Sequence, residues 1–190
     1  FVIGVWPGKC CFPDMLDDKA RQWFSDKYRI LIDKGIDGFW NDMNEPAIFY
    51  SEKHLKEVFE KMEDYKKMNL DVNTFFEMTG MIGSICNNPE DYASFYHNYR
   101  GKRYRHDQVH NLFGYYMTRS ASEAFERYVP EKRILLFSRA SYIGMHRFGG
   151  IWQGDNLSWW SHLKMNVQMM PSLNMCGYLY TGADTGGFGA

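Results

Sequence analysis

Short apolar runs alternate with longer amphipathic stretches along the chain, and the two patterns predict different elements. Short apolar runs typical of strands occur at residues 1–6, 36–40, 133–139, 149–155 and 177–184. A helical period of apolar side chains occurs at residues 17–34, 51–68, 107–129 and 157–169, whereas residues 69–90 are less regular. Strands that alternate with helices form a parallel sheet, so the chain is predicted to be an α/β protein.

Four of the predicted strands lead into a charged residue. These four residues are Asp42, Arg139, Asp155 and Asp184. Active residues at the C-terminal ends of several parallel strands are typical of a (β/α)8 barrel. Because only four or five strand units are present, we expect the chain to form about half of such a TIM barrel.

The segment from about residue 50 to 105 does not follow the strand–helix alternation. It holds a predicted amphipathic helix, the irregular stretch, a turn at Asn88–Asp91 and a hairpin turn at Tyr99–Lys102. We interpret it as an inserted helical and hairpin segment on one partial catalytic barrel domain, residues 1–190. Half a barrel leaves strand edges and an apolar face uncovered, so the isolated chain is predicted to be unstable and inactive.

Composition excludes some classes of protein and leaves others open. The net charge is −1 and no run of about 18 apolar residues occurs, so we expect neither a nucleic-acid partner nor a membrane span. The aromatic content of 17% fits either a large core or a site that stacks on sugars. The four cysteines form no CxxC pair, which predicts reduced and mostly buried thiols and a cytoplasmic location.

Two carboxylates and an arginine at one barrel mouth suit glycoside hydrolysis. In a retaining enzyme one carboxylate attacks the anomeric carbon while the other protonates the leaving oxygen, with the pair about 5–5.5 Å apart. A single Asp at a strand end more often caps a helix or pairs with a basic neighbour. The spacing also does not tell which of Asp42, Asp155 and Asp184 attacks.

Two other interpretations compete with this one. Asp42, Asn44 and Glu45 offer the oxygen ligands that Mg²⁺ or Ca²⁺ takes. Residues 42 and 44 share a face only if the strand continues, however, and Glu45 is then expected to point away, so we expect no metal and no cofactor. The second interpretation is a non-catalytic barrel that binds carbohydrate, although such a barrel has no need of both carboxylates.

Five separate motifs resemble glycoside hydrolase family 31. Residues 38–46 (GFWNDMNEP) resemble the family's signature around the nucleophile, an aromatic residue followed by Trp-x-Asp-Met-Asn-Glu. The other four motifs, in the family's order along the chain, are VWPG with FPD at residues 5–14, FSRAS at 137–141, GIWQGD at 150–155 and TGADTGGF at 181–188. The similarity covers essentially the whole chain and is strongest toward α-glucosidases of bacteria, including gut bacteria.

The resemblance implies a role for each matching residue. Asp42 would be the nucleophile and Asp155 the general acid and base of a retaining enzyme. Arg139 would bind hydroxyl groups of the sugar, and Asp184 would hydrogen-bond to an aromatic residue or an arginine of the site. The residues implied to line the sugar pocket are Trp40, Met43, Trp152 and Phe188.

The resemblance also implies a substrate class. The expected activity is hydrolysis of terminal α-linked glucose from oligosaccharides, so the partner is an α-glucoside. An α-xylosidase or a transglycosylase of the same family is the alternative, because the family includes both. The sequence also leaves open a homo-oligomer that forms through other parts of the full-length protein.

Overall fold

The computed structural model describes residues 1–189 and contains a four-stranded parallel sheet. Its strands, in spatial order, are β3 (Gly38–Asn41), β7 (Leu135–Ser138), β8 (Gly150–Trp152) and β9 (Thr181–Gly182). All neighbouring pairs are parallel, with Asn41 opposite Ser138 and Phe137 opposite Gly150. The predicted α/β organisation is therefore confirmed, and the C-terminal ends of the strands lie along one edge of the sheet.

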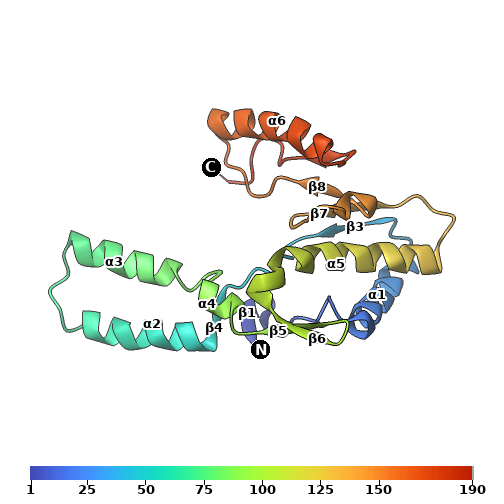
Figure 1. Cartoon of the computed structure of the whole chain (residues 1–190). Coiled ribbons are helices and arrows are strands. Elements are labelled where there is room, and N and C mark those ends of the chain that lie inside the picture. Colours follow the sequence, from blue (N-terminus) through green and yellow to red (C-terminus); the bar gives the residue numbers. More distant parts are fainter. Residues whose placement is uncertain (190) are drawn as a thin grey trace.

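One face of the sheet is covered by two helices, α1 (Asp18–Ile32) and α5 (His106–Tyr128), as Figure 1 shows. Leu136 of β7 packs there in a buried core with Ala121 and Phe125 of α5. Side chains alternate along a strand, so the neighbours of Leu136 point to the opposite face. Of these, Leu135 is 53% exposed, and Trp40 of β3 on the same face is 65% exposed. The sheet thus has one packed face and one open apolar face.

The ends of α1 follow from local chemistry. Asp17 is its N-cap, and its carboxylate accepts hydrogen bonds from the backbone of Lys19 (3.0 Å) and Ala20 (2.9 Å). Gly35 has φ = 86°, a left-handed conformation that stops the helix at small cost only for glycine.

Residues 1–6 contain a strand, as predicted, but this strand does not join the parallel sheet, which has four strands. The strand β1 (Ile3–Val5) pairs antiparallel with β2 (Gly8–Cys10) and with β4 (Tyr50–Ser51). Pro7 and Gly8 reverse the chain at once, since Gly8 adopts φ = 103°, and the resulting hairpin cannot supply a parallel neighbour. Ile3 is buried instead with Ile48 and Phe95 in a separate core.

Two helices differ from the sequence prediction. The irregular stretch contains α3 (Val72–Gly83), which the glycines at 80 and 83 obscured; Asp71 caps it by accepting a hydrogen bond from Thr74 N at 2.8 Å. The last helix, α6 (Trp160–Met175), begins later than predicted and continues through Pro171. Its final turn is closed beyond the proline, because Cys176 N donates to Ser172 O at 3.2 Å.

The segment of residues 50–105, which the sequence analysis interprets as an insertion, projects from the sheet (Figure 1). The helix α2 (Glu52–Tyr65) runs beside α3, and together they form an arm that leaves the rest of the chain (Figure 1). After the arm come α4 (Pro89–Tyr92) and a hairpin of β5 (Tyr96–Tyr99) and β6 (Lys102–Arg105), which leads into α5. A short 3₁₀ helix, Met145–Arg147, lies between β7 and β8.

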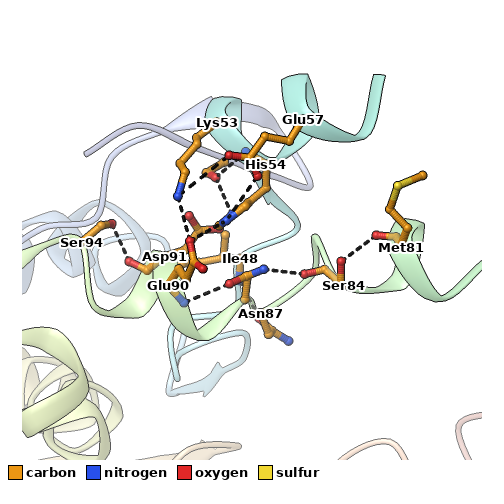
Figure 2. Close-up of polar contacts among 12 residues, drawn as sticks. Ile48, Lys53, His54, Glu57, Met81, Ser84, Asn87, Glu90, Asp91 and Ser94 are labelled. Carbon is orange, nitrogen blue, oxygen red and sulfur yellow. Dashed lines mark hydrogen bonds and ion pairs between the residues drawn. The ribbon is translucent and has the colours of Figure 1, made fainter. Parts of the chain in front are cut away.

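A histidine–carboxylate cluster anchors the base of this arm to α4 (Figure 2). His54 of α2 is buried, and its Nδ1 lies 3.1 Å from Oδ2 of the buried Asp91. Its Nε2 lies 3.3 Å from Glu90 Oε2, which also accepts a hydrogen bond from Lys53 at 2.7 Å. Burial disfavours the charged imidazole, but the hydrogen bond and charge of Asp91, with help from Glu90 and Glu57, outweigh it and raise the pKa of His54.

The raised pKa predicts that the arm is anchored more firmly in acid. A raised folded-state pKa contributes stability that is complete below the ordinary value of 6.5 and is lost as the pH rises through the folded-state pKa. Amide exchange in α2, corrected for its intrinsic pH dependence, should therefore accelerate relative to α5 as the pH rises above about 6.5. His54→Gln should remove this difference and the control His162→Gln should keep it; an unchanged α2-to-α5 ratio in the unmodified protein would contradict the prediction.

The cysteines lie at the surface, against expectation. Cys11, Cys86 and Cys176 are exposed and Cys10 is half-buried, and all four are free thiols. Cys86 and Cys176 each follow the end of a helix, where the connecting chain runs over the surface. Among residues 1–189, no helix combines the length and the apolar character that crossing a membrane requires.

Candidate active site

The parallel register brings three of the predicted charged residues to one place. Asp42 directly follows β3, Arg139 directly follows β7, and Asp155 comes three residues after β8. Because Asn41 and Ser138 are register partners, Asp42 and Arg139 are neighbours on adjacent strand ends. The backbone N–H of Arg139 donates to Asn41 O at 3.1 Å, which extends the ladder up to the site.

The guanidinium of Arg139 lies between the two carboxylates. Its Nη1 is 3.2 Å from Asp42 Oδ1 and 3.7 Å from Asp155 Oδ2. The two oxygens are therefore separated by no more than the sum of these distances, which is compatible with the roughly 5–5.5 Å of a retaining pair. The side chain of Arg139 is 18% exposed, whereas those of Asp42 and Asp155 are 48% and 54% exposed, so both carboxylates remain open to an incoming molecule.

Glu45 is a member of this cluster that the sequence analysis placed wrongly. Its two oxygens accept hydrogen bonds from Arg139 Nε (2.8 Å) and Nη2 (2.9 Å), a bidentate pair. The expectation that Glu45 points away assumed an extended strand. Met43 instead has φ = 58° and its carbonyl accepts from Ala47 N at 3.0 Å, so the chain turns and brings Glu45 inward. This pairing raises the pKa of Arg139 further, chiefly through the hydrogen bonds to Glu45.

Asn44 fixes this turn against the next strand end. It is 1% exposed, its Nδ2 donates to Ser138 Oγ at 2.9 Å, and its Oδ1 accepts from Ala140 N at 3.1 Å. Both hydrogen-bonding ends of a buried amide are thus satisfied by the residues on either side of Arg139. Asn44 therefore sets the spacing between the end of β3, which carries Asp42, and the end of β7, which carries Arg139.

The open face below the cluster is aromatic. Trp40 and Trp152 meet edge to face with ring centroids 4.9 Å apart. They line a hollow of about 650 Å³ together with Phe137 of β7 and Asp184 beyond β9. Met43 reaches the cluster itself, with its Sδ 3.0 Å from Arg139 Nη2. Phe188 does not join these residues: it is 71% exposed and does not line the hollow.

Asp184 lies beside the carboxylates without a direct contact to the arginine. Its backbone N–H and carbonyl are both bound by the side chain of Asn156, each at 3.1 Å. Burial raises the pKa of Asp184, and the charges of Asp155 and Asp42 raise it further. Within residues 1–189 its carboxylate makes no hydrogen bond to an arginine or an aromatic side chain, so that implied contact is not seen.

The cluster does not suit a metal ion. The three oxygen-bearing residues weighed as ligands do not converge, because Asn44 is engaged with Ser138 and Ala140. The space between Asp42 and Glu45 holds the guanidinium of Arg139, a cation in its own right. Among the residues described, no group of three or more His, Cys, Asp and Glu side chains has the arrangement to bind a metal.

Comparison with known proteins gives a consistent picture. Residues 1–190 match the family model described as "Glycosyl hydrolases family 31 TIM-barrel domain". Over 184 residues, the chain is 32% identical to alpha-glucosidase 2 of Bacillus thermoamyloliquefaciens, a match that covers 97% of the chain and 19% of that relative. It is 31% identical to an alpha-glucosidase of Saccharolobus solfataricus, over 99% of the chain and 25% of the relative.

Solved structures share the fold. A family 31 dextranase of Flavobacterium johnsoniae, complexed with glucose, aligns with a TM-score of 0.70 at 21% identity and covers 98% of the chain and 19% of its own length. The family 31 alpha-glucosidase of Bacteroides thetaiotaomicron aligns with a TM-score of 0.60 at 26% identity, over 97% of the chain and 23% of its own length. The chain thus spans about a fifth to a quarter of the length of these relatives.

Proposed function

Because the chain belongs to glycosyl hydrolase family 31 and forms part of its TIM-barrel domain, we propose that it carries the catalytic carboxylates of a retaining α-glycosidase. The observation that supports this most is the position of Arg139, whose Nη1 contacts both Asp42 and Asp155. Two carboxylates on adjacent strand ends, held by one cation and open to solvent, are the groups that double displacement requires.

In this proposal Asp42 is the nucleophile. Its carboxylate attacks the anomeric carbon while the bond to the leaving oxygen breaks, and Asp155 transfers its proton to that oxygen. The product is a glycosyl ester on Asp42. Asp155, now ionised, takes a proton from water, whose oxygen attacks the same carbon and releases Asp42. Two inversions give net retention of the α configuration.

The remaining residues hold the machinery and the sugar. Glu45 fixes the guanidinium in a bidentate pair, so that Arg139 faces the carboxylates and the hydroxyl groups of the bound sugar. The faces of Trp40 and Trp152 offer an apolar surface to the sugar ring. We propose Met43, Asp184 and Phe188 as further substrate contacts; Phe188 reaches the sugar only if the rest of the barrel directs it there.

Terminal α-linked glucose is the proposed substrate. It is supported by the curated relatives, two of which are alpha-glucosidases at about 30% identity. The substrate-binding site must be completed by other parts of a barrel, because the sheet face that carries Trp40 and Leu135 is open. We therefore propose that the activity belongs to the whole protein, meaning these residues within a complete barrel, and that the isolated chain is inactive.

Parallel assays of an aryl α-glucoside and an aryl α-xyloside, with the product anomer followed by NMR, test this proposal in the whole protein. We expect preferential cleavage of the glucoside and α-glucose as the first product. Preference for the xyloside would keep the mechanism and change the substrate, and transfer to added maltose in place of water would indicate a transglycosylase. First release of the β anomer, or no turnover of either compound, would contradict the proposal.

Glu45 supplies a second test. Glu45→Gln removes the charge and leaves only one acceptor for the fork of Arg139, so the guanidinium loses its fixed position between the carboxylates. A displacement of about 1 Å at such a site costs on the order of 10² in rate, so we expect kcat/KM for the aryl glucoside to fall roughly 10- to 100-fold. Glu57→Gln on the exposed arm is the matched control and should leave kcat/KM unchanged. Equal kcat/KM values for the two variants would contradict a role for Glu45 in the site.

A further inference from the structure

A row of three imidazoles runs through the junction of the inserted segment and α5, and the proposed reaction does not use it. Asp14 Oδ1 lies 2.8 Å from His97 Nδ1, His97 Nε2 lies 2.8 Å from His106 Nδ1, and His106 Nε2 lies 2.8 Å from His110 Nδ1. His97 and His106 are 2% and 0% exposed. The row therefore joins a carboxylate near the N-terminus to His110 in the first turns of α5.

The carboxylate at one end decides which nitrogens carry hydrogen. Burial raises the pKa of Asp14, but hydrogen bonds from His97, Asn98 and Leu16 outweigh it and lower the pKa, so Asp14 only accepts. His97 Nδ1 must then donate to Asp14. Burial, and next the neighbours His97 and His110, lower the pKa of His106 to about 3, so its ring is neutral. A single hydrogen on each ring satisfies all three contacts when each Nδ1–H donates toward Asp14 and each Nε2 accepts, which leaves a lone pair on His110 Nε2.

That lone pair belongs to a residue that lines an open pocket of about 540 Å³. This is the size of clefts that hold small ligands, which range from about 300 to 1,000 Å³. The pocket offers two tyrosines, Tyr92 and Tyr142, and the side chain of Asn111 beside His110. Its lining contains no lysine or arginine. Within residues 1–189, His110 hydrogen-bonds to His106 through its Nδ1, and no hydrogen bond uses its Nε2.

The pocket is next to the candidate active site but separate from it. Tyr92 donates from its hydroxyl to Pro46 O at 3.0 Å, directly after Glu45 in the chain. Burial, followed by the charge of Glu45, raises the pKa of Tyr92, so its hydroxyl keeps the proton that it donates. The Glu45–Pro46 segment thus stands between this pocket and the guanidinium of Arg139.

We propose that this pocket is a second carbohydrate site, which binds a neutral sugar through a hydroxyl group donated to His110 Nε2. The nearby carboxylates are already paired, Asp107 with Arg105 and Glu45 with Arg139, and the lining contains no lysine or arginine. The lone pair therefore selects a neutral hydroxyl donor over an ammonium, a carboxylate or a phosphate. The tyrosine rings supply the apolar surface that sugar rings pack on. The choice of a sugar as the ligand rests on the proposed function. The proposal gives the protein a second site, at which a glucan binds without being cleaved.

Calorimetric titration of the whole protein with maltose tests the site. The Asp42→Asn background prevents turnover, and His110→Asn is then compared with it. Asparagine can place its amide near the position of Nδ1 and keep the donor to His106, while it lacks the acceptor at Nε2. We expect two maltose sites per chain in the background, and about three- to tenfold weaker binding at one of them in His110→Asn, as the loss of one hydrogen bond implies.

Asp14→Asn tests the row from its far end, without touching the pocket. An amide can donate to His97 Nδ1, which allows the whole row to reverse and turns His110 Nε2 into a donor. We expect a similar weakening of the second site, whereas Asp17→Asn, which keeps a helix cap, should have no effect. Equal maltose affinity in His110→Asn and the background, or a single site per chain in the background, would overturn the proposal. Absent turnover in the unmodified protein with two intact sites would instead count against the catalytic proposal alone.

Discussion

Replacement of Asp42 by alanine is expected to lower kcat for an aryl α-glucoside by at least about 10⁴-fold, the order of loss that follows removal of a protein nucleophile. In the proposed mechanism the carboxylate of Asp42 forms the glycosyl ester, and we expect no neighbour to replace it. Asp155 is assigned to proton transfer in the same proposal, and Glu45 is bound at both oxygens by Arg139. Stopped assays with the whole protein at saturating substrate measure the loss.

The design includes a matched control and a chemical rescue. Asp33→Ala removes an exposed carboxylate at the end of α1, where it pairs with Arg29 at 3.4 Å, and should keep near-normal kcat. Azide added to Asp42→Ala can enter the space left by the carboxylate and attack from the same side, giving β-glucosyl azide. Residual kcat within about tenfold of the unmodified protein, or α-glucosyl azide as the rescue product, would contradict the assignment.

Replacement of Asp155 by alanine is expected to lower kcat/KM for maltose by about 10²- to 10⁴-fold, the usual contribution of a general acid. The leaving oxygen of maltose is a poor leaving group without a proton. An aryl glucoside with an acidic phenol leaves as a stable anion, so its kcat/KM should fall far less. The difference between the two substrates is the signature of the acid role, and a merely misfolded variant loses both alike.

Asp184→Ala is the control variant for the assignment of Asp155 as the acid. Asp184 is the other candidate acid, because burial and the neighbouring carboxylates raise its pKa. We expect its loss to affect maltose and the aryl glucoside equally, as a contact to the sugar would. If Asp184→Ala shows the selective loss of maltose cleavage and Asp155→Ala does not, the two roles are exchanged.

The polar ends of the parallel strands could be predicted from sequence because they depend on a simple rule. Carboxyl ends of parallel strands share one edge, so Asp42 and Arg139 had to meet once β3 and β7 were recognised as neighbours. Short-range signals also placed α1 between its Asp17 cap and Gly35. These features are set by local chemistry and by strand direction.

Other features depend on tertiary structure that no periodicity reveals. Glu45 faces inward because Met43 takes a left-handed backbone conformation, and the pattern of apolar residues in a strand does not predict this conformation. The pairing of β1 with β4 joins residues 3 and 51, and it depends on the path of the chain between two strands far apart in sequence. His106 and His110 are four residues apart on a helix, a visible hint, but His97 joins them only through the hairpin that precedes α5.

The most direct test of the account is to trap the glycosyl ester. Asp155→Ala in the whole protein is given α-glucosyl fluoride, whose leaving group needs no acid, while hydrolysis of the ester is slow without the base. Digestion and mass spectrometry then locate the attached hexose. The account predicts one hexosyl ester, placed on Asp42 by fragmentation of the peptide that holds both Asp42 and Glu45. An ester on Glu45 or Asp184, or the absence of any ester with release of β-glucose, would contradict it.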